Sequence, residues 1–67
     1  MKQVNYTNKQ KHINGAYITT AELLTAFYPD GVPIDRLRAH MENAKEYLTE
    51  EQIDTAENIT KEKYNII

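Results

Sequence analysis

Residues 33–48 read PIDRLRAHMENAKEYL and carry the clearest periodicity in the chain. Apolar side chains recur there at alternating intervals of three and four residues: Ile34, Leu37, Met41, Ala44 and Leu48. This spacing places all of them on one face of an α-helix, and it covers too short a stretch to argue for a coiled coil. We therefore predict a helix whose apolar face packs in the core of a small antiparallel bundle. The alternative is that the same face forms the seam of a homodimer.

The residues before this stretch predict another helix. Thr19 followed by Glu22 has the spacing of a capping box, so we expect a helix to begin directly after Thr19. The residue before a proline avoids the helical region, and Pro29 should therefore end this helix at about Tyr28. Pro33 suits the first turn of the helix that follows. The expected apolar face consists of Leu23, Leu24, Phe27 and Tyr28.

Residues 1–18 predict a different kind of structure. Asn14-Gly15 is the pair favoured in a two-residue type I′ turn, and β-prone residues flank it on both sides. The first 20 residues also contain three lysines and no acidic residue. We expect residues 1–18 to form a basic arm or a short β-hairpin, joined to a helical body of residues 19–67 in a single domain.

A third helix is predicted after the central stretch. Thr49 and Gln52 form a second capping box, which places a helix start at about Glu50. Its inner side should carry Ile53, Ala56, Ile59 or Thr60, and Tyr64. The predicted fold is therefore mainly α: a small three-helix bundle, or a helical hairpin plus a short helix, with a short N-terminal β-hairpin or arm. The predicted core consists of Leu23, Leu24, Phe27, Ile34, Leu37, Met41, Ala44, Leu48, Ile53 and Ala56.

Composition narrows the classes of function. The chain has 67 residues, a net charge of −2 and no cysteine, so disulfides and thiolate metal sites are excluded. No secretory signal pattern and no apolar run long enough to cross a membrane is visible, so we expect a cytoplasmic protein without a membrane partner. The frequent use of Asn, Lys, Ile and Tyr is typical of an AT-rich bacterial or phage genome.

Catalytic chemistry has few candidate residues. The chain contains no serine, two glycines and two histidines, and neither His12 nor His40 has a neighbour at a metal-ligand spacing. The carboxylates fall mainly on the predicted exposed faces of helices. We expect no enzymatic activity, no cofactor and no metal, with both histidines in solvent.

The stretch TTAELLTAFYPDGVPIDRLRAH, residues 19–40, weakly resembles a helix-turn-helix, a DNA-binding motif. The resemblance implies a recognition helix over residues 33–45 and a basic N-terminal arm. Three features count against it: a long turn with two prolines, Phe27 where the family usually has a small residue, and acidic residues on the recognition helix. The residue types that can reach phosphates or base edges are Lys9, Lys11, Arg36, Arg38, His40, Asn43 and Lys45.

The main hypothesis is that the chain is a small regulatory or inhibitory protein that binds a larger protein. Its acidic helix faces can match a basic patch or imitate a phosphate backbone. Exposed tyrosines are favoured at protein interfaces, because each offers a large contact area and a polar tip. The residues expected to make the contacts are Tyr28, Glu42, Glu46, Tyr47, Glu50 and Glu51.

Overall fold

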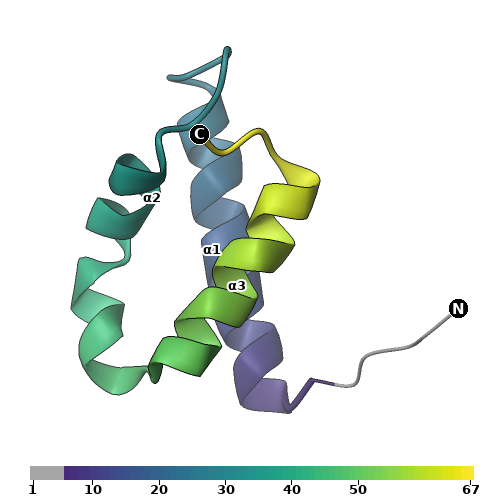
Figure 1. Cartoon of the computed structure of the whole chain (residues 1–67), viewed down its shortest axis with the longest axis vertical. Helices are drawn as coiled ribbons and strands as arrows, with labels where there is room; N and C mark the ends of the chain where they lie inside the picture. The colour runs from purple at the N-terminus through teal and green to yellow at the C-terminus, as the bar shows by residue number, and fades with distance from the viewer. Residues whose placement is uncertain (1–5) are drawn as a thin grey trace, which may run out of the picture.

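The structure is a computed structural model that describes residues 6–67. Its elements are α1 (Asn8–Thr25), α2 (Ile34–His40), the 3-10 helix η1 (Glu42–Tyr47) and α3 (Glu50–Lys63). Figure 1 shows α1 and α3 side by side and running in the same direction, while α2 and η1 lead back from the end of α1 to the start of α3. The predicted mainly α class is confirmed.

The N-terminal β-hairpin is the largest error of the sequence prediction. One continuous helix occupies residues 8–25, and its N-cap Thr7 accepts a hydrogen bond from the Gln10 backbone N–H at 3.1 Å. Asn14-Gly15 lies within this helix, where neither residue has the positive φ that a type I′ turn requires. The basic arm is also helical from residue 8 onward, and residues 1–5 of that prediction lie outside the described residues.

Burial of one apolar face explains why the helix prevails over the local turn preference. The buried apolar residues of α1 are spaced by four, four and three positions: Ile13, Tyr17, Ala21 and Leu24. This is a helical repeat, and it runs directly across Asn14-Gly15. Asn14 itself is buried, and its Oδ1 accepts a hydrogen bond from Gln10 Nε2 at 2.7 Å. The packing of this apolar face against the core thus outweighs the preference of Asn14-Gly15 for a turn.

The structure also corrects the predicted start and the predicted buried side of this helix. Thr19 and Glu22 lie inside α1 and do not cap it. Leu24 is buried, whereas Leu23 is 59% exposed and Phe27 is 72% exposed, so neither of these two belongs to the core. Because successive helical residues are rotated by about 100°, the face that buries Leu24 turns Leu23 toward solvent. The helix ends at Thr25, three residues before the predicted Tyr28.

The predicted central helix is divided at Met41. α2 ends at His40, and residues 42–47 continue as η1, with the Ala44 N–H donating to the Met41 carbonyl at 3.0 Å. Pro33 is the N-cap of α2 rather than a residue of its first turn. The apolar stripe nevertheless faces the core: Leu37 and Met41 are buried, and the partly buried members are Ile34, Ala44 and Leu48. Ile34, Ala44 and Leu48 therefore pack against the core of their own chain, and the stripe is not left free to form the seam of a homodimer.

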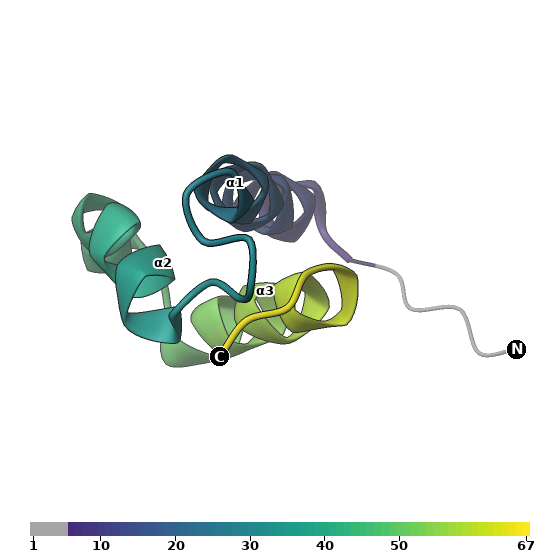
Figure 2. The ribbon, with the colours of Figure 1, turned by 90° about the horizontal axis from the view of Figure 1, so that it is seen from above.

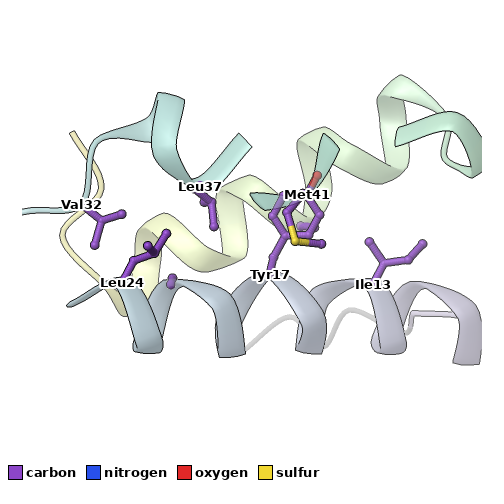
Figure 3. Packing of buried hydrophobic residues seen from close by; sticks show 8 residues of the cluster. Ile13, Tyr17, Leu24, Val32, Leu37 and Met41 are labelled. Carbon is purple, nitrogen blue, oxygen red and sulfur yellow. The ribbon is translucent and has the colours of Figure 1, made fainter. Parts of the chain in front are cut away.

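The third helix agrees with its prediction. The Thr49 N–H donates to Gln52 Oε1 at 2.9 Å, and the Gln52 N–H donates to Thr49 Oγ1 at 3.1 Å, which completes the capping box before Glu50. Ala56 and Thr60 are fully buried. The core formed with the other helices is shown in Figure 3 and consists of Ile13, Tyr17, Ala21, Leu24, Val32, Leu37, Met41 and Ala56. The prediction had missed Ile13, Tyr17, Ala21 and Val32.

The last residues of the chain return to the loop between α1 and α2. Val32 and Ile66 form a parallel β-bridge, in which the Val32 N–H donates to the Asn65 carbonyl and the Ile67 N–H donates to the Val32 carbonyl, both at 2.8 Å. Gly31 has a φ of +145°, and a Cβ placed there would lie 3.2 Å from the Ile67 side chain. The close approach of residue 67 thus depends on a glycine at position 31.

We expect Gly15→Ala to stabilise the protein by about 0.5–1 kcal/mol, because glycine in a helix interior costs about that much relative to alanine. Apart from its chain neighbours and the backbone of its own helix, no atom of the described residues lies within 4 Å of the position that the new Cβ would occupy. Thermal unfolding followed by circular dichroism measures the change. Gly31→Ala is the matched control, since the same substitution there is strained and should lower the melting temperature. A lower melting temperature for Gly15→Ala would contradict the helical assignment.

Candidate functional site

η1 leads into α3 at the lower end of the molecule in Figure 1, and four exposed glutamates and one exposed tyrosine belong to these two elements. We call this surface the acidic corner; it consists of Glu42, Glu46, Tyr47, Glu50 and Glu51. All five residues are exposed, and Tyr47 is 77% exposed. The segment has this position because Leu48 packs against the core and Thr49 starts α3 with its capping box. Only Leu48 and Thr49 separate η1 from α3, so the carboxylates of the two helices are close together in the sequence.

A groove of about 520 Å³ lies beside the acidic corner, and its lining residues are Arg38, Lys45, Glu50, Ile53, Asp54 and Glu57. The two cations that line it are engaged by carboxylates. Arg38 pairs with Glu57, and Lys45 Nζ lies 3.6 Å from Glu42 Oε2. Within residues 6–67, Glu50 and Asp54 form no salt bridge. The groove therefore offers two carboxylates beside the apolar Ile53.

Arg38 and Glu57 form the most specific polar contact of the structure. Arg38 Nε donates to Glu57 Oε2 at 2.9 Å and its Nη2 donates to Oε1 at 3.0 Å, a bidentate arrangement. The Glu57 side chain is 6% exposed and that of Arg38 is 44% exposed. These hydrogen bonds lower the pKa of Glu57 despite the opposing effect of burial. The pair therefore fastens α2 to α3.

Sequence reasoning missed the role of Glu57. It assigned the carboxylates mainly to exposed helix faces, whereas Glu57 is buried beside Ala56. The available signal was its position four residues after Ile53, on the predicted inner side of that helix. Next to it, the Tyr17 hydroxyl is buried and has no hydrogen-bond partner among residues 6–67. Burial raises the pKa of Tyr17, and the negative charge of Glu57 adds to this effect.

The residues predicted to bind protein do not all come together. Tyr28 lies after α1, at the opposite end of the molecule from the acidic corner. It is only half-buried, and its ring packs against the core. We therefore exclude Tyr28 from the candidate site and retain the five residues of the acidic corner.

The residues predicted to contact DNA are distributed over three elements. Lys9 and Lys11 lie in the first turns of α1; the others lie on α2 and η1, namely Arg36, Arg38, His40, Asn43 and Lys45. Residues 33–45 do not form one recognition helix, because α2 ends at His40. Arg38 is held by Glu57, and the Nδ1 atom of His40 is 2.9 Å from the Arg36 carbonyl. Arg36 remains exposed.

No group of three or more His, Cys, Asp or Glu side chains in residues 6–67 is placed to hold a metal ion. Among the same residues, every helix is too short or too polar to cross a membrane. Comparison of the chain with protein-family models, curated proteins and solved structures gave no match.

Proposed function

We propose that the chain is a small non-enzymatic regulatory or inhibitory protein that binds a larger protein through the acidic corner. The observation that supports this most is the 77% exposure of Tyr47 among four exposed carboxylates. When a partner covers a large aromatic ring that is exposed to solvent, the free energy of the complex is lowered. Tyrosine is also enriched among the residues that dominate binding energy. The surrounding carboxylates favour a basic partner surface and accelerate its association.

The groove beside the corner adds a specific contact to this proposal. Glu50 and Asp54 flank it without a salt bridge of their own among the described residues, and Ile53 contributes an apolar surface. A lysine or arginine side chain of the partner can lay its aliphatic stem on Ile53 and place its charge between the two carboxylates. DNA binding draws less support from the same region, since two of its candidate cations, Arg38 and Lys45, already pair with carboxylates.

The setting that we propose for this protein is the cytoplasm of a bacterium or of a phage-infected bacterial cell. Residue usage supports such a source, and a chain without cysteine needs no oxidising compartment.

The test is affinity capture from host lysate with matched variants of the immobilised chain. Tyr47→Ala and Glu46→Lys alter the acidic corner, while Glu22→Lys makes the same charge reversal on α1, at an exposed position outside it. We expect one protein to be retained by the wild type and by Glu22→Lys and to be lost from both corner variants. Loss of a dominant tyrosine contact costs at least about 2 kcal/mol, which is roughly 30-fold in affinity.

Retention that survives both corner variants would contradict the proposal. Retention that instead depends on Arg36 and disappears after nuclease treatment would favour the DNA-binding alternative.

A further inference from the structure

The groove beside the acidic corner contains a lysine of the chain itself. Lys45 lies on η1 and lines the groove, while Glu50, Ile53 and Asp54 line it from α3. Figure 2 shows the two walls from above, with α2 and the helix that follows it on one side of α1 and α3. The Lys45 side chain is only 35% exposed, whereas the other lysines of residues 6–67 are all exposed. Its positive charge thus belongs to the same groove that receives the partner's cation in the proposed function.

A single ion pair restrains the Lys45 ammonium. Its Nζ atom lies 3.6 Å from Glu42 Oε2, and within residues 6–67 it forms no other salt bridge. This distance is longer than the about 2.7–2.9 Å of a charge-assisted hydrogen bond, and the Glu42 side chain is 72% exposed. Exposed pairs of this kind are weak, because water and salt screen them. Lys45 can therefore leave Glu42 at little cost in free energy.

The interior of the groove attracts the same ammonium. Glu50 and Asp54 form no salt bridge within residues 6–67, and a lysine head group on its flexible stem can turn toward them. The charge of Lys45 already acts inside the groove. The pKa of Glu57, which also lines it, is lowered mainly by the hydrogen bonds from Arg38, and Lys45 contributes to the same effect.

We propose that Lys45 regulates the groove as an internal competitor of the partner's cation. When it is paired with Glu42, it leaves Glu50 and Asp54 to a lysine or arginine of the partner. When it turns inward, it neutralises these two carboxylates and repels the partner's side chain. Because it acts in the groove of the proposed function, this regulation rests on that function. It also gives Glu42 a role that needs no contact with the partner: Glu42 holds Lys45 out of the groove.

The test uses Nα-acetyl-lysine methylamide as a probe, since this molecule presents one lysine side chain and no other charge. Its binding is followed at low ionic strength through the backbone amide NMR shifts of Ile53 and Asp54. Lys45→Met keeps the aliphatic stem and removes the charge. We expect it to bind the probe about three to five times more tightly than the wild type, which is the effect of two like charges a few ångströms apart in water.

Lys61→Met is the matched control for this measurement. It removes one positive charge from an exposed position of α3 that does not line the groove, and it should change the affinity for the probe less than about two-fold. Each substituted side chain is at least partly exposed, so both variants should fold normally, which circular dichroism verifies.

A double-variant cycle tests the role of Glu42. Glu42→Gln should weaken probe binding about three-fold in the wild type, because it releases Lys45 into the groove, and it should have little effect in Lys45→Met. Glu46→Gln is the matched control. It removes another carboxylate of the acidic corner that is not paired with Lys45, so its effect should be the same in both backgrounds.

Three results would overturn the regulation by Lys45. They are probe binding that is unchanged or weaker in Lys45→Met, an effect of Glu42→Gln that is equal in both backgrounds, and absence of probe binding in every variant. Failure of the proposed function is read separately, from retention in the lysate experiment that does not depend on Tyr47 or Glu46.

Discussion

Leu37→Ala should leave the protein largely unfolded at room temperature. The Leu37 side chain has no exposed surface and belongs to the core between the three helices. Truncating a buried leucine removes its transfer free energy and leaves a cavity, which together cost about 2–5 kcal/mol. A domain of this size buries a smaller share of its surface on folding than a larger domain does, so it has little stability to lose. Urea unfolding followed by circular dichroism measures the change.

Leu23→Ala is the matched control for this prediction. It is the same chemical change on a leucine that is 59% exposed, and at low micromolar concentration it should alter the free energy of unfolding by less than about 0.5 kcal/mol. An equally large loss of stability for Leu23→Ala would mean that the structure has assigned the wrong face of α1 to the core, and an equally small effect of Leu37→Ala would contradict the burial of α2. The sequence pattern predicts that Leu37 and Leu23 both lie in the core, whereas the structure buries only Leu37. Comparing the two substitutions therefore distinguishes the predicted core from the observed one.

Removal of the Arg38 side chain is the second large effect that we expect. Arg38→Met leaves the Glu57 carboxylate, 6% exposed, without its cation. Loss of one partner of a buried pair is strongly destabilising, and because Arg38 is itself 44% exposed we expect about 1–3 kcal/mol at neutral pH. The double variant Arg38→Met/Glu57→Gln removes the charge as well, and it should recover part of this loss.

The pH dependence of stability has opposite signs in the two proteins. In the wild type the pKa of Glu57 is lowered by Arg38, so the stability from this contact is present above the ordinary glutamate pKa of 4.5 and is lost as the pH falls through the lower folded value. In Arg38→Met, burial without a cation should raise the pKa of Glu57. This residue then disfavours folding at neutral pH and ceases to do so as it becomes protonated.

Urea unfolding between pH 3 and pH 7 measures both effects. The difference in stability between the wild type and Arg38→Met should shrink as the pH falls. A pH-independent difference for Arg38→Met would show that the ion pair contributes nothing to the fold.

The parts of the fold that could be predicted are those encoded by neighbouring residues. The capping box of Thr49 and Gln52 satisfies its own backbone groups within four residues, so it holds in any tertiary context. The inward stripe of α2 was also visible, because Leu37 and Met41 repeat at helical spacing. The hairpin failed because Asn14-Gly15 is an equally local signal, yet the burial of Tyr17 against distant residues overrides it.

The candidate site was predictable in part. Exposed carboxylates around Tyr47 follow from the polar face of the central stretch and the start of the third helix. The contact between Arg38 and Glu57 joins residues that are 19 positions apart, and its formation depends on how α2 packs on α3. Local spacing does not encode that packing. The prediction from local spacing therefore assigns Arg38 to a DNA-binding surface and Glu57 to an exposed helix face.

The 3-10 segment has a consequence for the free energy of local opening. η1 buries none of its own residues, whereas α1 and α3 share the core and are the pair that must separate for global unfolding. Residues 42–47 can thus exchange their amide hydrogens through a local opening that leaves α1 and α3 packed. Three residues of the acidic corner, Glu42, Glu46 and Tyr47, lie on η1, where we expect the weakest protection, so a bound partner should slow amide exchange in η1 before it changes exchange in α1 or α3.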